Sequence, residues 1–323
     1  MIEIILPDEK FLKPCFGVNR ALKKCLNLEN KREYLVYGEL AHNQRLVEKV
    51  EQSGIRSVNS LSDKQNIIIR AHGITKCDKK KLKKHIDLTC PFVTAFKEKA
   101  LKYEKDGFQI VIIGDKNHAE IKNVVSYLES PIVVHTKKEA TELPYFNKLA
   151  CMSQTTERQE MIDQIVPTLR KKAEQFQYIE TRCGETKTRQ ETAQSLARRV
   201  DLLIVAGDTH SANANNLLKI GQTHTKAILV NSSEEISKKD LSNVRTFDKT
   251  SKNLGERIRT FDKTSKNLGE RIRTFDKTSK NLGFRKIKVG IIASASTPHF
   301  VVDEIIKSIR TFDKTSKNLG GKI

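Results

Sequence analysis

"QIVIIGDKNHAEIKNVVSYLES", residues 109–130, contains the unit from which most of the chain is built. Its first part, 109–114, is a short apolar run rich in Ile and Val that ends in glycine, which is typical of a buried strand. Its last part, 122–130, is amphipathic, which is typical of a helix covering a sheet. The stretch therefore predicts a strand and a helix joined by a loop that carries His118 and Glu120.

The same alternation recurs along the chain. Further candidate strands lie at 2–6, 33–37, 66–71, 86–90, 131–135, 149–154, 178–183, 202–207, 227–230 and 287–294. Strands that alternate with helices predict an α/β fold with parallel sheets and right-handed crossovers. The strands fall into three groups, which favours three small, pseudo-repeated units rather than one wide sheet. We place the units at 14–95, 96–182 and 183–309, with the N-terminal strand, 1–13, joining the third.

The chain of 323 residues has a formal charge of +20, but nearly half of this charge comes from a repeated segment. "RTFDKTSKNLGERI" begins at Arg245, repeats at Arg259 and returns shortened at Arg273 and Arg310. Each copy offers little apolar surface to bury, so we interpret 245–284 as a solvated, mostly disordered insertion and 310–323 as a tail of the same kind. The alternative is a basic arm that binds nucleic acid or an acidic protein. We expect both segments to lie at the amino-terminal edge of a parallel sheet, away from the expected site.

The remaining composition favours a protein of the bacterial cytoplasm. No apolar run is long enough to span a membrane, and the N-terminal residues predict a strand rather than a leader peptide. Six cysteines are too few for a disulfide scaffold in a chain of this length, so they are metal ligands, catalytic groups or buried residues.

Chemistry-bearing side chains follow one predicted strand after another. In parallel α/β folds, ligands bind beyond the carboxyl ends of the strands, so these side chains are expected to gather at one functional edge. They are Cys15, His42, His72, Cys90, His118, Glu120, Thr155, Cys183, Ser211, Asn213 and Ser296.

The three cysteines in this group fit either an iron–sulfur cluster or a zinc ion, although a single cysteine at a strand end is more often just buried. Pro91 favours a ligand role for Cys90, because a Cys-Pro step also closes ferredoxin-type ligand runs. We expect Pro91 to end the strand there and turn the sulfur into the cleft. Cys25, Cys77 and Cys151 are interpreted as structural.

The histidines and hydroxyls suit an anion. Loop imidazoles, hydroxyls and backbone N–H groups at helix starts can bind a diphosphate, whereas a lone loop histidine is usually a solvated surface residue. The chain contains no Walker-type or dinucleotide-binding glycine loop, which argues against a nucleotide.

Nine motifs then identify a family resemblance. They are "CFGVNRA" (15–21), "GELAHN" (38–43), "AHG" (71–73), "DLTCPFV" (87–93), "IIGDKNHAE" (112–120), "MSQTT" (152–156), "CGETKTRQ" (183–190), "GDTHSANANNL" (207–217) and "ASASTP" (293–298). In this order, and across nearly the whole chain outside the repeats, they resemble the 4-hydroxy-3-methylbut-2-enyl diphosphate reductase (LytB or IspH) family of the non-mevalonate isoprenoid pathway.

The resemblance implies three α/β units around a [4Fe-4S] cluster held by Cys15, Cys90 and Cys183, with one iron left open for the substrate hydroxyl. It implies reductive dehydroxylation of the allylic diphosphate to isopentenyl and dimethylallyl diphosphate, with Glu120 delivering protons and Thr155 beside the hydroxyl. It assigns the diphosphate to side chains of the three units: His42, His72, His118, Ser211, Asn213 and Ser296. It also implies a flavodoxin or ferredoxin as electron donor, and we expect no nucleic-acid or membrane partner.

Three departures from the family pattern stand near these residues. The usual Gly-Phe before Cys15 is missing, Ala212 stands where a second serine is common, and no aromatic residue follows Cys183. Two rival functions remain open: a non-catalytic basic metalloprotein that binds nucleic acid, and a zinc hydrolase. An enzyme losing its activity is a third possibility. The low aromatic content, 6% with no tryptophan, argues against base-stacking platforms for RNA.

Overall fold

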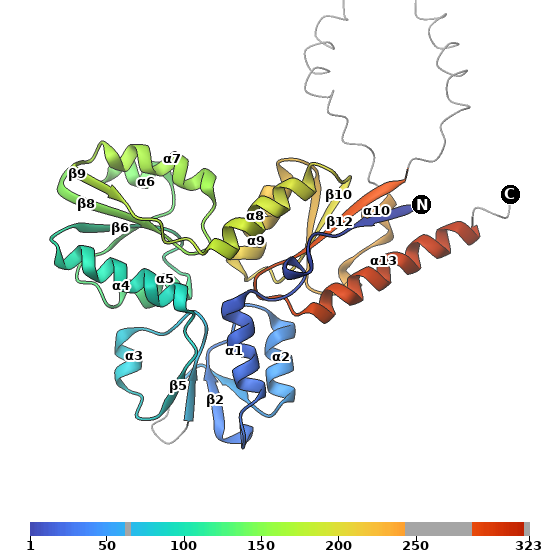
Figure 1. Ribbon diagram of the computed structural model, residues 1–323, viewed down its shortest axis with the longest axis horizontal. Coiled ribbons are helices and arrows are strands. Elements are labelled where there is room, and N and C mark those ends of the chain that lie inside the picture. Colours follow the sequence, from blue (N-terminus) through green and yellow to red (C-terminus); the bar gives the residue numbers. More distant parts are fainter. Residues whose placement is uncertain (62–65, 243–285, 320–323) are drawn as a thin grey trace, which may run out of the picture.

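A computed structural model describes residues 1–61, 66–242 and 286–319, and the predicted insertion at 245–284 lies outside these ranges. Within these ranges, twelve strands form three separate four-stranded sheets in which every pairing is parallel. Each sheet with its helices forms one lobe of a three-lobed molecule (Figure 1). The α/β prediction is confirmed.

The first lobe is built on the strand order β3–β2–β4–β5. Its strands are β2 (Tyr34–Tyr37), β3 (Arg56–Val58), β4 (Asn66–Ile69) and β5 (His85–Asp87). Its helices are α1 (Phe16–Leu26), α2 (Gln44–Gln52) and α3 (Lys76–Lys80), with a 3-10 turn at Lys31–Glu33. Apolar residues of β2 and β4 pack against α1 and α2 in one buried cluster. The sequence did not predict β3, because this edge strand is short and polar.

The second lobe has the order β7–β6–β8–β9 and is covered on both faces. Its strands are β6 (Gln109–Ile113), β7 (Ile132–Val134), β8 (Phe146–Ser153) and β9 (Ala173–Tyr178). Its helices are α4 (Pro91–Lys105), α5 (Ala119–Val125), α6 (Lys137–Glu142) and α7 (Gln159–Arg170). Ile110 and Ile112 face one apolar cluster and Val111 and Ile113 the other, which explains the uninterrupted apolar run of β6.

The third lobe joins the two ends of the chain in the order β1–β12–β10–β11. Its strands are β1 (Ile2–Ile5), β10 (Leu202–Ala206), β11 (Lys226–Val230) and β12 (Ile287–Ala293). Its helices are α8 (Gly184–Ala197), α9 (Ala212–Gln222), α10 (Lys238–Ser242) and α13 (His299–Leu319), with 3-10 turns at Glu9–Phe11 and Ser233–Glu235. The chain re-enters the sheet at Ile287, which pairs with Ile2 at its amino-terminal edge.

The last repeat copy extends a helix. The prediction of a mostly disordered tail is wrong for residues 310–319, because α13 continues to Leu319. Phe312 follows Ile309 at helical spacing and packs against the third-lobe core. Asp313 accepts a hydrogen bond from the backbone N–H of Ile2 at 2.8 Å. Phe312 of this copy therefore continues the apolar stripe of α13 at helical spacing.

Two predicted strand ends also differ from the structure. The strand predicted at 86–90 ends at Asp87, and Pro91 begins α4 instead of ending a strand. Proline suits the first helical position because its missing N–H needs no partner there. The strand predicted at 178–183 is wrong except for Tyr178, because β9 spans Ala173–Tyr178 and the chain then leaves the sheet. Among the described residues, no helix is both long and apolar enough to cross a membrane.

Candidate functional site

A single cavity at the junction of the three lobes is lined by all eleven candidate site residues of the sequence analysis. The first lobe and its links contribute Cys15, His42, His72 and Cys90; the second contributes His118, Glu120 and Thr155; the third contributes Cys183, Ser211, Asn213 and Ser296. Most of them lie in the segments that follow strand ends, as parallel sheets require. No single lobe carries the whole set, so the cavity exists only in the assembled fold.

The three cysteines share one structural position. Cys15, Cys90 and Cys183 are the N-cap residues of α1, α4 and α8. Their backbone N–H groups donate to the carbonyls of Ala295, Ala71 and Thr155 at 2.9, 2.9 and 3.0 Å. Three helix N-termini, each with a partial positive charge, are therefore associated with the three sulfur atoms.

Gly17 lets the sulfur atom of Cys90 lie against the helix that follows Cys15. A Cβ atom built on Gly17 would lie 2.5 Å from Sγ of Cys90, which is closer than real carbon–sulfur contacts allow. The Cys90 sulfur thus lies directly against the first turn of α1. The sequence analysis did not single out Gly17, because this requirement arises only from the contact between α1 and the start of α4.

Burial holds the free thiols of Cys15 and Cys90 in their protonated form. It raises the pKa of Cys15 to about 12 and also raises the pKa of Cys90, whose sulfur is further affected by the charges of Cys183 and Glu120. Cys15 and Cys90, two thiols that are costly to ionise, form with Cys183 a donor set at three helix N-termini that a metal centre would stabilise as thiolates. The residues present therefore fit a metal centre.

Sequence reasoning did not identify Arg189, which stabilises the segments next to Cys15 and Cys183. Its side chain is fully buried on α8. Its guanidinium donates to the carbonyls of Phe11 and Ala293 at 3.2 and 2.8 Å and to Oε1 of Glu185 at 3.1 Å. Phe11 lies four residues before Cys15, and α8 begins directly after Cys183. Arg189 therefore connects the two segments that carry these cysteines.

Glu120 is a buried acid beside Thr155. One carboxylate oxygen accepts the backbone N–H of Thr155 at 2.8 Å, and the other accepts its hydroxyl at 2.6 Å. Burial raises the pKa of Glu120 despite these hydrogen bonds. The site therefore contains a carboxyl group poised to hold and release a proton next to a hydroxyl.

The three histidines form a ring cluster. His42 and His72 stack with centroids 4.4 Å apart, and His118 stands edge-on to them at 5.4 and 5.3 Å. Burial and the neighbouring imidazoles lower the pKa of His72, and burial lowers that of His118 to about 4. Nδ1 of His118 accepts the N–H of Glu120, so its other ring nitrogen carries the proton in the neutral form.

The ring cluster could hold either a cation or an anion. Its ligand atoms lie within 4.8 Å of one another, as metal ligands do. The positive charge of Arg70, however, also lowers the pKa of His72 and His118. Since the same positive charge repels a cation and attracts an anion, the electrostatics favour an anionic ligand here.

Polar groups of the third lobe complete the cavity wall. Both side-chain polar atoms of Asn213 are buried without a hydrogen-bond partner. Oγ of Ser211 accepts the N–H of Ala214 at 3.3 Å at the start of α9. Buried polar atoms without partners are costly, so those of Asn213 are available to a ligand.

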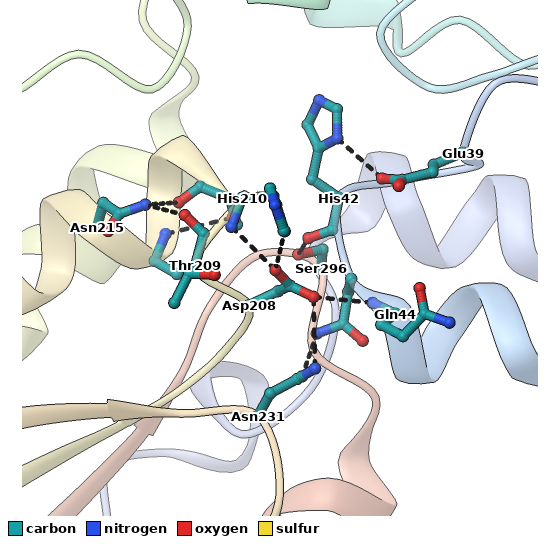
Figure 2. Close-up of polar contacts among 12 residues, drawn as sticks. Glu39, His42, Gln44, Asp208, Thr209, His210, Asn215, Asn231 and Ser296 are labelled. Atoms are coloured by element: carbon teal, nitrogen blue, oxygen red, sulfur yellow. Dashed lines mark hydrogen bonds and ion pairs between the residues drawn. The ribbon is translucent and has the colours of Figure 1, made fainter.

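An aspartate network joins the loops of the first and third lobes next to these groups (Figure 2). Oδ2 of Asp208 accepts the N–H of Gln44 at 3.1 Å, and Oδ1 accepts the N–H of His210 at 2.9 Å. Beside it, Ser296 donates its hydroxyl to the carbonyl of His42 at 2.9 Å. Sequence reasoning quoted Asp208 within a motif but gave it no role, because its partner Gln44 is distant in the chain.

Comparisons with known proteins bear on the whole chain. The model of a family described as "LytB protein" matches residues 11–310. A Campylobacter hominis protein named 4-hydroxy-3-methylbut-2-enyl diphosphate reductase is 38% identical over 69% of this chain and 84% of its own length. A Clostridioides difficile protein of the same name is 31% identical over 90% of this chain and 94% of its own.

Solved structures resemble the fold. A Plasmodium falciparum structure titled as the E-1-hydroxy-2-methyl-but-2-enyl-4-diphosphate reductase matches with a TM-score of 0.75 at 24% identity, covering 94% of this chain and 86% of its own. A second, titled as the terminal enzyme of the non-mevalonate pathway, matches with a TM-score of 0.59 at 25% identity, covering 96% and 100%.

Proposed function

Because the chain belongs to the LytB protein family, we propose that its central cavity reduces 4-hydroxy-3-methylbut-2-enyl diphosphate to isopentenyl and dimethylallyl diphosphate. The chain is thus an oxidoreductase of the non-mevalonate isoprenoid pathway, and its substrate is a small diphosphate. The observation that carries the proposal is the meeting of three thiols, one buried acid and a ring cluster of histidines around a single cavity.

At the thiol end, we propose that Cys15, Cys90 and Cys183 hold a [4Fe-4S] cluster. Three thiols at helix N-termini support this assignment. Three protein ligands for four irons leave one iron without a protein ligand. When bound, such a cluster supplies a Lewis acid for the substrate hydroxyl and a route for electrons.

At the acid, Glu120 supplies the proton with which the substrate hydroxyl leaves as water. Its raised pKa keeps the carboxyl protonated more readily than an exposed glutamate. Thr155, 2.6 Å from its carboxyl oxygen, positions the hydroxyl or relays the proton. The balanced reaction breaks the C–O bond, consumes two electrons and two protons, and forms one C–H bond and one water.

At the histidine end, the diphosphate is bound by His42, His72, His118, Ser211, Asn213 and Ser296. The unpartnered atoms of Asn213 and the field of Arg70 support an anion there. Phosphate oxygens would also raise the pKa of His72 and His118 from their lowered values, since a nearby negative charge favours the protonated ring.

Anaerobic purification followed by an assay with a strong small-molecule reductant tests this function. We expect a brown protein that contains iron and turns over the hydroxymethylbutenyl diphosphate. We expect Glu120→Gln to lose about 100-fold or more in kcat while keeping its iron, because it removes the general acid. The matched control is Glu142→Gln, an exposed glutamate on α6.

Two results would reject the proposal or part of it. A colourless protein that binds zinc and hydrolyses the substrate would favour the zinc hydrolase instead. Unchanged turnover by Glu120→Gln would remove Glu120 from its role while leaving the reductase activity in place.

A further inference from the structure

Glu39 lies beside the ring cluster, in the short loop that leads from β2 to His42. One oxygen of its carboxylate, Oε2, is 3.1 Å from Nδ1 of His42 (Figure 2). Of the three clustered rings, only that of His42 makes an ion-pair contact with a carboxylate in the described part of the chain. The proposed function leaves Glu39 without a role.

The surrounding structure fixes the position of the His42 ring. Leu40 and Ala41, which precede it in the loop, are each 1% exposed, so the loop is held by its buried part. The carbonyl of His42 accepts the hydroxyl of Ser296 at 2.9 Å, and its ring stacks on that of His72. Backbone and ring face are thus fixed by two different elements, and the carboxylate contact fixes the ring edge.

The carboxylate also decides which nitrogen of His42 carries a proton. An ionised carboxylate only accepts hydrogen bonds, so Nδ1 of His42 is the donor, and in the neutral ring Nε2 then carries a lone pair. His118 has the opposite arrangement, because its Nδ1 accepts the backbone N–H of Glu120 at 3.2 Å. Nδ1 of His72 is buried without a partner. The three rings therefore differ in the nitrogen that they offer to a ligand.

A neutral His42 is poorly suited to a diphosphate. Phosphate oxygens are acceptors, and they would meet the lone pair of Nε2. When Nε2 takes up a proton, both ring nitrogens donate, Nδ1 to Glu39 and Nε2 to the phosphate. Negative charges on both sides stabilise this imidazolium, and its hydrogen bonds are about twice as strong as those of a neutral ring.

Other charged groups around the ring do not replace Glu39. They come from the segment after β4, the loop before α5 and the third lobe: Arg70, His72, Asp115, His118 and Asp208. Arg70 and the two imidazoles, when charged, would repel a charged ring. The charge of Asp115 acts on His118, and Asp208 already accepts two backbone N–H groups. Glu39 is therefore the acid available to the His42 ring.

We infer that Glu39 is a positioning residue that orients His42 and makes it the ring that takes up a proton when the diphosphate binds. The inference rests on the proposed function, because it concerns the substrate-binding step of that reaction. The proton comes from solvent, and no covalent bond of the substrate changes. Glu39 is not among the described residues that line the cavity, so it acts through His42.

Substrate binding to the anaerobic, iron-loaded chain tests the inference, with no reductant present so that no turnover occurs. Calorimetry at about pH 8, above the usual pKa of histidine, measures the Kd. Two buffers with different heats of ionisation then give the number of protons taken up per bound substrate. Glu39→Gln removes the charge and Glu39→Asp keeps it. Glu48→Gln is the matched control, because the Glu48 and Glu39 side chains are 45% and 48% exposed.

We expect Glu39→Gln to raise the Kd and the KM about tenfold, with a smaller change in kcat. It should also take up fewer protons than the parent, by up to about one per bound substrate. The proton equilibria of the substrate itself are the same for every variant. Glu39→Asp should recover part of both losses, and Glu48→Gln should bind like the parent. The direction is diagnostic, because removal of a negative charge would by itself tighten the binding of an anion.

Unchanged or tighter binding by Glu39→Gln, or parent-like proton uptake, would overturn the inference. So would an equal loss from Glu39→Gln in the parent and in a His42→Gln chain, since a residue that acts through His42 has no further effect once the ring is absent. The ¹⁵N spectrum of the unmodified chain gives an answer that needs no folded Glu39 variant: a neutral His42 ring protonated at Nε2 instead of Nδ1 would contradict the assigned orientation. A parent that neither binds nor turns over the substrate would instead reject the proposed function.

Discussion

The two ends of the central cavity are stabilised in different ways. At the thiol end, each cysteine is an N-cap whose backbone N–H already has a partner. At the histidine end, Nδ1 of His72 and both side-chain polar atoms of Asn213 are buried without a hydrogen-bond partner. Backbone hydrogen bonds therefore fix the thiol end before any ligand arrives, whereas the histidine end gains its full set of hydrogen bonds only with a ligand.

Burial acts on both ends in the same direction, toward neutral groups. It raises the pKa of Cys15 to about 12 and lowers that of His118 to about 4. Two thiols, Cys15 and Cys90, and two imidazoles, His72 and His118, thus carry little charge until a ligand supplies the opposite one. A metal centre would favour thiolates at one end, and a diphosphate would favour imidazolium at the other. A site for two oppositely charged ligands can in this way fold without strong internal repulsion.

The strongest test of the thiol end removes one sulfur. Cys90→Ser should reduce iron from about four atoms per chain to nearly none and abolish turnover, because one of the three proposed protein ligands is removed. Iron analysis and the electronic spectrum of anaerobically purified protein measure the effect. Cys77→Ser is the control, since this exposed cysteine of α3 lies outside the cavity. A Cys90→Ser chain that kept all its iron would show that the thiol end is not the metal site.

The histidine end should respond to acid. An unfolded histidine takes up a proton below pH 6.5, whereas folded His118 does so only below about pH 4. The unfolded state therefore binds more protons in this window, and the free energy of unfolding should rise by up to about 3 kcal/mol as the pH increases from 4 to 6.5.

Urea unfolding of the metal-free chain across this pH range measures the slope, which His118→Gln should flatten. His85→Gln is the control, because that ring is exposed on β5. Added pyrophosphate should reduce the slope of the parent, since a bound anion favours the protonated rings. A slope that His118→Gln does not change would contradict burial of the neutral ring.

Adding one methyl group at Gly17 tests whether iron binding depends on the close contact between α1 and the Cys90 sulfur. Gly17→Ala places a Cβ atom 2.5 Å from Sγ of Cys90. We expect the sulfur to be displaced and the affinity for iron to fall by about tenfold, the equivalent of about 1.4 kcal/mol. The matched control is Gly184→Ala, which also follows a cavity cysteine but whose Cβ would meet nothing within 4 Å. Equal iron contents in the two variants would reject the close packing of α1 against Cys90.

The smallest expected effect is a gain at the histidine end. Ala212, the first residue of α9, lines the cavity between Ser211 and Asn213. Ala212→Ser adds one hydroxyl near the proposed diphosphate site, and we expect KM to fall about fivefold, since one hydrogen bond contributes about 1 kcal/mol. Steady-state assays measure KM, with Ala95→Ser on the exposed face of α4 as control. A KM that rises or stays constant would place the diphosphate away from α9.

The predictability of the fold differed between central and peripheral elements. The buried run at 109–114 predicted β6 because both faces of that strand are covered, which leaves an unmistakable apolar stretch. The edge strand β3, Arg56–Val58, gave no such signal. The tail at 310–319 looked like a solvated repeat, yet the position of Phe312 one turn after Ile309 makes it part of α13. Its composition predicted a solvated tail, but its helical register against the core decided its structure.

The candidate site was predictable to the extent that its chemistry is local in the sequence. Every cysteine, histidine and hydroxyl proposed for the cavity follows a strand or begins a helix, so sequence pattern alone could nominate all eleven. Gly17 and Arg189 could not be found this way, because their roles depend on contacts with Cys90 and Phe11.

The sequence by itself therefore determined the alternation of strands and helices, the residue types at their ends, and the family to which they point. Only the tertiary structure decided which of these groups meet, how the imidazoles stack, and that buried Arg189 and Gly17 allow the thiol end to close. The physical reason is the range of the forces. Hydrogen-bonded secondary structure depends on neighbours a few residues away, whereas burial, and with it every shifted pKa in the cavity, depends on lobes that are distant in the chain.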